Sequence, residues 1–184
     1  MVCFFLFEAI ISGKWFGPRP YVCNGPLTGT YVFAQLHFHW GPDDEQGSEH
    51  TLDGQKLPLE MHVIFFNSIY MTQDDAKNKK DGIIVFSYFF KLQAEDNENL
   101  SPIVNSLRLI RQPFKSEHLE LMPLMELVYP FEDDYFLYWG NVSGKESQHP
   151  VLWLLCRHPY LISSGQVATG SFILLMNYRN AITK

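Results

Sequence analysis

The chain has 184 residues and a mass of 21.4 kDa, with 46% apolar and 18% charged residues. This composition excludes a wholly disordered chain, and the length suits one domain with a sizeable core. Fourteen basic against twenty acidic residues give a net charge of −6 without the basic face of a nucleic-acid-binding protein, and no apolar run reaches the roughly 18–20 residues of a membrane helix.

The three cysteines, Cys3, Cys23 and Cys156, exclude a disulfide-rich scaffold and a Cys-rich zinc module. They leave open one bridge with a leftover thiol, or three reduced thiols. The first twelve residues (MVCFFLFEAIIS) are apolar but contain Glu8 and have no basic start, which favours an internal strand over a signal peptide. The compartment therefore stays open between secreted and cytoplasmic.

Strand patterns dominate the rest of the chain. A strand is predicted at residues 31–40 (YVFAQLHFHW), where alternation places four side chains on one face: Phe33, Gln35, His37 and His39. Further strands are predicted at residues 59–66, 82–92, 135–139, 151–156 and 171–177. The segment at 82–92 (GIIVFSYFFKL) is almost wholly apolar, which indicates burial on both faces.

Helix signals are few. The best helix is predicted at residues 99–111, with Ser101 as the N-cap, Pro102 in the first turn, and Leu107 and Ile110 directed inward. A charged stretch between the second and third strands (QDDAKNKKD) is predicted to be a solvated loop or a short helix. No repeat or linker is visible, so the sequence predicts one mostly β domain built on a large sheet.

Three histidines on neighbouring predicted strands are the most informative feature. His37 and His39 share a strand face because they are two residues apart, and His62 lies 23 residues further on, in the next strand. Three neutral imidazoles with a fourth position open are typical of catalytic zinc. Gln35 and Glu60 each precede a histidine by two residues, where a side-chain oxygen can accept a hydrogen bond from its second nitrogen. The alternative, an HxH pair as mere polar decoration of a strand, does not explain this common phase.

A second metal-binding fold, the cupin barrel, also uses an HxH pair followed by a Glu, a Gly and a later His. Glu45, Gly47 and His62 imitate that order loosely. The Glu stands too far along the chain and the later Gly-Pro context is missing, so the cupin barrel remains only a weaker alternative to the catalytic zinc site.

Three segments resemble the signature region of the α-class carbonic anhydrases: residues 25–41 (GPLTGTYVFAQLHFHWG), 47–54 (GSEHTLDG) and 59–67 (LEMHVIFFN). The resemblance is strongest over residues 21–92 and weaker over residues 135–179. It implies that family's fold over residues 1–184, a single mostly β domain with a large twisted, predominantly antiparallel central sheet and few short helices. It also implies zinc-dependent reversible hydration of carbon dioxide to bicarbonate and a proton, by attack of zinc-bound hydroxide.

The resemblance assigns roles residue by residue. The family's three zinc ligands correspond to His37, His39 and His62. Glu49 corresponds to the carboxylate that orients a gatekeeper hydroxyl. A gapless alignment from Trp153 back to Tyr138 places that hydroxyl on Ser143, which lacks the methyl group that stiffens χ1 in the family's threonine.

Supporting positions follow from the same resemblance. His50 and Tyr138 match a supporting pair, and Asn177 matches a residue whose backbone carbonyl holds one ligand. The family's apolar substrate pocket corresponds to Ile64, Val85, Val142, Val151 and Trp153. Without the resemblance, these five side chains would be taken for ordinary core residues.

The chain also departs from the family. Where the family has a threonine and a proline pair after the gatekeeper, this chain has Gly144, Lys145 and Glu146. The stretch from Trp153 to Asn177 is shorter, which removes most of a surface helix. Relative to the family, the sequence starts after the segments that carry the proton-shuttle histidine and stops soon after Arg179. We therefore expect a fold truncated at both ends, with an exposed sheet edge.

Two functions stay open on this basis. One is a working zinc lyase whose partner is a small molecule, carbon dioxide or bicarbonate. The other is a carbonic-anhydrase-related protein that binds zinc but is catalytically weak. The complete set of three histidines favours the enzyme, whereas the altered loop and the missing segments favour the second. The oligomeric state is not determined by these features.

Overall fold

The structure is a computed structural model that describes residues 2–4, 9–15, 17–110, 116–120, 122–129, 134–142 and 149–170. Strands within these residues are β1 (Val2–Phe4), β2 (Ala9–Ile11), β3 (Tyr21–Val22), β4 (Tyr31–Trp40), β5 (Leu59–Asn67), β6 (Ile83–Gln93), β7 (Ser116–Glu117), β8 (Tyr135–Gly140), β9 (Val151–Cys156) and β10 (Tyr160–Ser163). The strands predicted between residues 31 and 156 are therefore confirmed, whereas the one at 171–177 lies outside the described residues.

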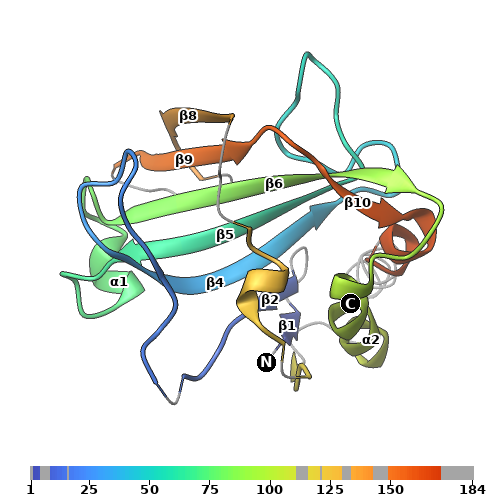
Figure 1. The fold of residues 1–184 in the computed structure, drawn as a ribbon, viewed down its shortest axis with the longest axis horizontal. Coiled ribbons are helices and arrows are strands. Elements are labelled where there is room, and N and C mark those ends of the chain that lie inside the picture. The colour runs from blue at the N-terminus through green and yellow to red at the C-terminus, as the bar shows by residue number, and fades with distance from the viewer. Residues whose placement is uncertain are drawn as a thin grey trace, which may run out of the picture.

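All ten described strands belong to one mixed sheet. Its order is β7-β1-β2-β4-β5-β6-β9-β8, with β3 paired to β4 and β10 paired to β6, and Figure 1 shows it from β1 near the bottom to β8 at the top. Only the pairs β6–β9 and β6–β10 are parallel among the described pairings. The predicted mostly β, predominantly antiparallel fold with few short helices is confirmed.

The helices are short, as predicted. They are α1 (Gln73–Ala76), the 3₁₀ turns η1 (Glu98–Leu100) and η2 (Leu124–Glu126), and α2 (Ser101–Leu109); residues 164–170 are also helical. Leu107 and Ile110 are buried, which confirms the inward face of the predicted helix. Among the described residues, no helix has the length and apolar character needed to span a membrane.

The predicted N-cap of α2 is wrong. Ser101 is the first residue of α2, because the 3₁₀ turn η1 runs directly into the helix. The capping side chain stands upstream: Asn97 accepts a hydrogen bond from the backbone N–H of Asn99. Asn97 is therefore the last residue with extended backbone before the helical turns begin. Its side chain accepts a hydrogen bond from one of the first N–H groups, which have no partner within the helix.

A bulge in β4 decides which side chains face the histidines. Phe33 pairs with Phe65 but Gln35 pairs with Ile64, so Ala34 is an extra residue in the strand. An inserted residue shifts the alternation of side chains by one position. Phe33 consequently packs in the larger core with the opposite face of the strand, and the prediction that it shares the face of His37 is wrong.

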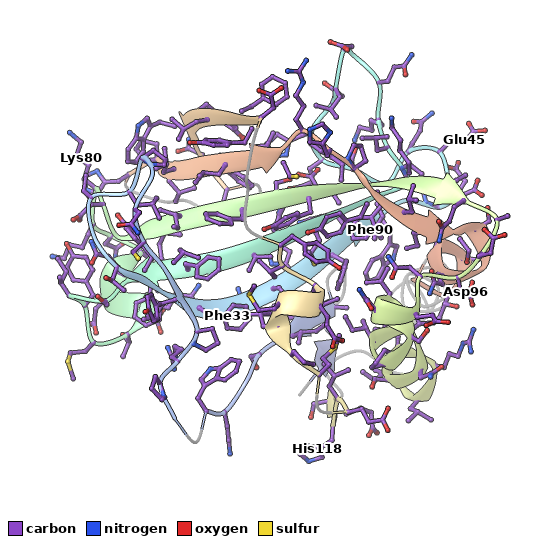
Figure 2. All side chains as sticks on the ribbon, viewed as in Figure 1. Phe33, Glu45, Lys80, Phe90, Asp96 and His118 are labelled. Atoms are coloured by element: carbon purple, nitrogen blue, oxygen red, sulfur yellow. The ribbon has the colours of Figure 1, made fainter. Side chains whose placement is uncertain are left out.

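Two apolar cores lie on the two faces of the sheet. The larger core receives α2 and alternate residues of β4, including Leu36 and Phe38, whereas the smaller core contains Ile64 and Trp153. All residues of β6 from Ile83 to Phe90 are buried, as the apolar run predicted. Figure 2 shows Phe33 and Phe90 inside the molecule, whereas Glu45, Lys80 and His118 stand at its periphery.

Strand β8 forms one edge of the described sheet, next to β9. Its large apolar side chains are between 37% and 53% exposed: Tyr135, Phe136, Leu137, Tyr138 and Trp139. This edge matters for the site because Tyr138 reaches inward from it.

Candidate metal centre

Three imidazoles meet where β4 pairs with β5. His37 lies directly opposite His62 in the strand register, and His39 follows His37 by two residues on the same face. Their ring centroids are 4.9 Å (37–39), 5.2 Å (37–62) and 4.5 Å (39–62) apart. One nitrogen of each ring lies within 4.8 Å of the other two, so the three rings could bind a single metal ion.

Glu60 determines which nitrogen of His62 faces the other two histidines. Nε2 of His62 is 2.7 Å from Oε1 of Glu60. An ionised carboxylate only accepts hydrogen bonds, so we assign the proton of this imidazole to Nε2. The lone pair is then on Nδ1, which is the atom His62 would offer to a metal.

His39 fits the same role. Its Nε2 is buried and has no hydrogen-bond partner among the described residues, with Oε2 of Glu49 at 3.6 Å. Burial, together with the neighbouring His62, lowers the pKa of His39 to about 3, so this imidazole is neutral at neutral pH. A buried ring nitrogen without a partner is costly, and a zinc ion would satisfy it. Three imidazole nitrogens are a donor set that zinc accepts, so these residues fit the metal.

We expect the zinc-free protein to lose stability as the pH falls from about 6.5 toward 3. His39 has a pKa of about 3 when folded against an ordinary 6.5, so the unfolded chain takes up the proton first. His39 therefore gives its full contribution to stability at pH values above 6.5. Below that pH, its contribution to the free energy of unfolding falls by at most about 1.4 kcal/mol per pH unit. Urea unfolding of chelator-treated protein across this range measures the slope. A His39→Gln variant should have a shallower slope above about pH 5, where carboxylates do not yet titrate; equal slopes would contradict the assignment.

Glu60 is fully buried and accepts five hydrogen bonds. Oε1 accepts from Nε2 of His62 at 2.7 Å, Nδ1 of His50 at 2.5 Å and Oγ of Ser87 at 2.6 Å. Oε2 accepts from the backbone N–H groups of Glu49 at 2.8 Å and His50 at 2.9 Å. Burial alone would raise the pKa of Glu60, but the hydrogen bonds from His50 and His62 outweigh it and hold this pKa well below its ordinary value. Glu60 is thus a charged anchor for His62 and for the loop at residues 49–50.

His50 connects this anchor to Tyr138, its predicted partner. Because Nδ1 of His50 donates to Glu60, Nε2 must accept, and the Tyr138 hydroxyl is 2.5 Å from it. Burial, followed by the charges of Glu60 and Glu49, raises the pKa of Tyr138 to about 12, so the hydroxyl keeps the proton that it donates. These hydrogen bonds also explain why His50, Glu60 and His62 lie close together without a metal.

Sequence reasoning missed Ser87. It is a fully buried serine in the middle of the apolar run IIVFSYFF, directly opposite His62 in the register of β5 and β6. A small polar side chain in a strand that is otherwise buried on both faces needs a partner inside the protein. That requirement was the available signal, and the partner is Glu60.

The remaining predicted site residues are placed as follows. Oε2 of Glu49 lies 3.6 Å from Nε2 of His39 and 4.0 Å from Nδ1 of His62, so this carboxylate borders the space between those two nitrogens. Gln35 is half-buried, two residues before His37 on the strand. Ser143 and Asn177 lie outside the described residues, so their roles stay predictions.

The predicted pocket residues gather beside the histidines. Ile64, Val85 and Trp153 are direct neighbours across β5, β6 and β9, and all three are buried. Val151 belongs to the same core, and the half-buried Val142 packs against it. The Trp153 ring faces His62, with 4.9 Å between the centroids. An apolar wall therefore adjoins the His62 imidazole; that it receives a substrate stays a prediction.

Gly47 lets the loop that carries Glu49 and His50 approach β5. The backbone N–H groups of Gly47 and Ser48 both donate to the carbonyl of Leu57 at 2.8 Å. A Cβ atom at position 47 would lie 1.8 Å from the carbonyl oxygen of Pro58, which no side chain tolerates. The glycine is therefore required by this close approach.

We expect Gly47→Ala to destabilise the protein and to loosen the site. The collision is with backbone, so the loop must move, and the N–H groups of Glu49 and His50 move away from Glu60. Overpacking of this kind costs about 1–3 kcal/mol. Urea unfolding and zinc content would measure both effects. The matched control is Gly17→Ala, because a Cβ there meets no atom within 4 Å; equal behaviour of the two variants would contradict the prediction.

Comparisons with known proteins find one family over most of the chain. Residues 9–182 match the family model of the eukaryotic-type carbonic anhydrases. The chain is 33% identical over 150 residues to carbonic anhydrase 3 of Homo sapiens, which covers 82% of this chain and 57% of that protein. It is 34% identical over 147 residues to carbonic anhydrase 1 of Monodelphis domestica (79% and 55% covered) and 34% identical over 146 residues to carbonic anhydrase 1 of Oryctolagus cuniculus (79% and 61% covered). The chain thus spans little more than half the length of the curated relatives it matches.

Proposed function

Because the chain belongs to the eukaryotic-type carbonic anhydrase family, we propose that it hydrates carbon dioxide reversibly to bicarbonate and a proton, with zinc as its cofactor. The observation that carries the proposal is the convergence of His37, His39 and His62, one nitrogen of each within 4.8 Å of the others. We also propose that residues 1–184 form one domain, because strands from both halves of the chain share one sheet.

A zinc ion held by His37, His39 and His62 would lower the pKa of a bound water to about 7 and so supply a nucleophile near neutral pH. The protein's part is to hold the imidazoles. Glu60 retains the proton on Nε2 of His62, so that Nδ1 keeps a free lone pair. Tyr138 donates to Nε2 of His50, which keeps the single N–H proton of that ring on Nδ1, where it is donated to Glu60.

Orientation of the nucleophile would fall to Glu49 and Ser143. The hydroxyl of Ser143 would accept a hydrogen bond from the nucleophile and donate its own proton to Glu49, as the family resemblance implies. Glu49 suits this task because its Oε2 already lies beside His39 and His62. The apolar wall of Ile64, Val85 and Trp153 suits carbon dioxide, which carries no charge that would demand a polar partner.

The test is to measure zinc content and the stopped-flow hydration rate on the same preparation. We expect one zinc per chain, loss of activity after chelation, and recovery when zinc is returned. A preparation that retains zinc but hydrates carbon dioxide no faster than the buffer would support the catalytically weak alternative. A folded chain that retains no zinc would contradict both.

We expect turnover to depend on the buffer. Each cycle must deliver a proton to solvent, and a group with a pKa near 7 does this best. None of His118, His149 and His158 matches the family's shuttle position, and His118 lines a cavity with Phe33 and Leu36 on the larger-core side of the sheet. Added imidazole at fixed pH and ionic strength should therefore raise kcat severalfold while kcat/KM changes little. A high kcat that ignores buffer concentration would show that the chain has a shuttle of its own.

A further inference from the structure

Ser87 has a contact that the family resemblance does not assign. Its hydroxyl is fully buried and donates to Oε1 of Glu60 at 2.6 Å. In the sheet, Ser87 stands between His62 on β5 and Leu155 on β9. Two hydrogen bonds, through Ser87 Oγ and His62 Nε2, therefore meet on one oxygen directly behind a predicted zinc ligand.

The partners of Oε1 differ in how firmly the fold holds them. His50 comes from the loop between β4 and β5, its side chain is 20% exposed, and its other nitrogen rests on Tyr138 of the exposed edge strand. Ser87 comes from the central strand β6, which is paired on both sides by β5 and β9. Residues on packed central strands are held more precisely than residues on loops. Ser87 is therefore the firmer of the two anchors.

Loss of the Ser87 hydroxyl would not leave Oε1 of Glu60 without hydrogen bonds. A carboxylate oxygen offers about two lone pairs, and His50 and His62 already donate to Oε1. Removing the Ser87 hydroxyl thus leaves Glu60 charged and hydrogen-bonded. The Glu60 carboxylate could then move together with the loop at residues 49–50, which supplies most of its remaining donors. We therefore expect the geometry of the hydrogen bond between Oε1 of Glu60 and Nε2 of His62 to change, while the stability of the fold changes little.

We propose that Ser87 is a positioning residue for the metal centre: its hydroxyl holds Oε1 of Glu60 against Nε2 of His62, which keeps Nδ1 of His62 aimed at the ion. The proposal rests on the proposed zinc site. Losing a direct partner of a metal-ligating histidine typically costs 10–100-fold in metal affinity, and Ser87 acts one hydrogen bond further out, so we expect zinc to dissociate about 3–10-fold faster without it.

The experiment compares Ser87→Thr with Ser87→Val. Both side chains are β-branched, suit a strand and have the same shape, so any crowding is common to both and only threonine keeps the hydroxyl. Zinc transfer to a chelator gives the dissociation rate, and the visible absorption of the cobalt-substituted protein reports the ligand geometry directly. We expect the threonine variant to match the wild type, and the valine variant to lose zinc about 3–10-fold faster with an altered cobalt spectrum.

Two further variants guard against a folding artefact. Ser87→Ala removes the hydroxyl without adding volume and should behave like the valine variant. Ser106→Ala removes a buried serine on α2 and should leave zinc release unchanged. If the wild type retains zinc and all position-87 variants release it at the same rate, the role of Ser87 is overturned while the zinc site stands. If the folded wild type retains no zinc, both the zinc site and the role of Ser87 are overturned.

Discussion

Replacing His62 with alanine should weaken zinc binding by at least about 100-fold. Structural zinc sites with four protein ligands bind the ion with about 10–16 kcal/mol, which is roughly 3 kcal/mol for each ligand. A catalytic site has only three protein ligands, so the loss is not compensated. Hydration activity should fall with the metal. Competition with a chromophoric chelator gives the affinity, and stopped-flow hydration gives the rate.

The fold should survive this substitution, which keeps the result interpretable. Glu60 would still accept hydrogen bonds from His50, Ser87 and two backbone N–H groups, so no buried charge is left alone. Urea unfolding of the zinc-free forms would verify this. His158→Ala, an exposed histidine after β9, is the matched control and should retain zinc. Full zinc occupancy in the His62→Ala protein would contradict the ligand assignment.

Replacing Ser143 with alanine should lower the hydration rate by on the order of 100-fold, the usual scale for the loss of one preorganised hydrogen-bonding group at the reacting atom. In the proposed mechanism, the Ser143 hydroxyl orients the nucleophile by accepting its hydrogen bond, and donates a hydrogen bond of its own to Glu49. Ser143→Thr should leave the rate equal or raise it, because the added methyl group restricts χ1.

Zinc content separates this effect from a damaged metal site. Both Ser143 variants should retain zinc like the wild type, since Ser143 is not among the three ligands. Glu49→Gln offers an independent check, because it removes the proposed acceptor of the same hydroxyl proton. An unchanged rate in Ser143→Ala would mean that the gatekeeper lies elsewhere in the chain.

Most strands and the histidine group could be predicted from the sequence, because both are encoded over short distances. The strand β9 begins and ends where predicted, and the apolar run around Ile84 is buried on both faces. His37 and His39 share a face simply because side chains alternate along a strand. Such patterns require only a few consecutive residues, so no knowledge of distant contacts is needed.

Several features depended on contacts between distant segments. The bulge at Ala34 reverses the face of Phe33, yet nothing in the local composition marks an extra residue. The strand β10 is four residues long and becomes a strand only because it pairs in parallel with the end of β6. The capping residue of the α2 region is Asn97, which lies upstream of the predicted Ser101. The Asn97 side chain also donates a hydrogen bond to the Leu161 carbonyl of β10.

By itself, then, the sequence determined the strand-rich architecture and the three imidazoles, because alternation and spacing along one chain place them. Only the tertiary structure decided how Glu60 is used. Its five donors come from the strand β5, the loop at residues 49–50 and the strand β6, so they meet only when the sheet has formed. Ser87 stands 27 residues from Glu60, and its role depends on strand register, which long-range packing selects.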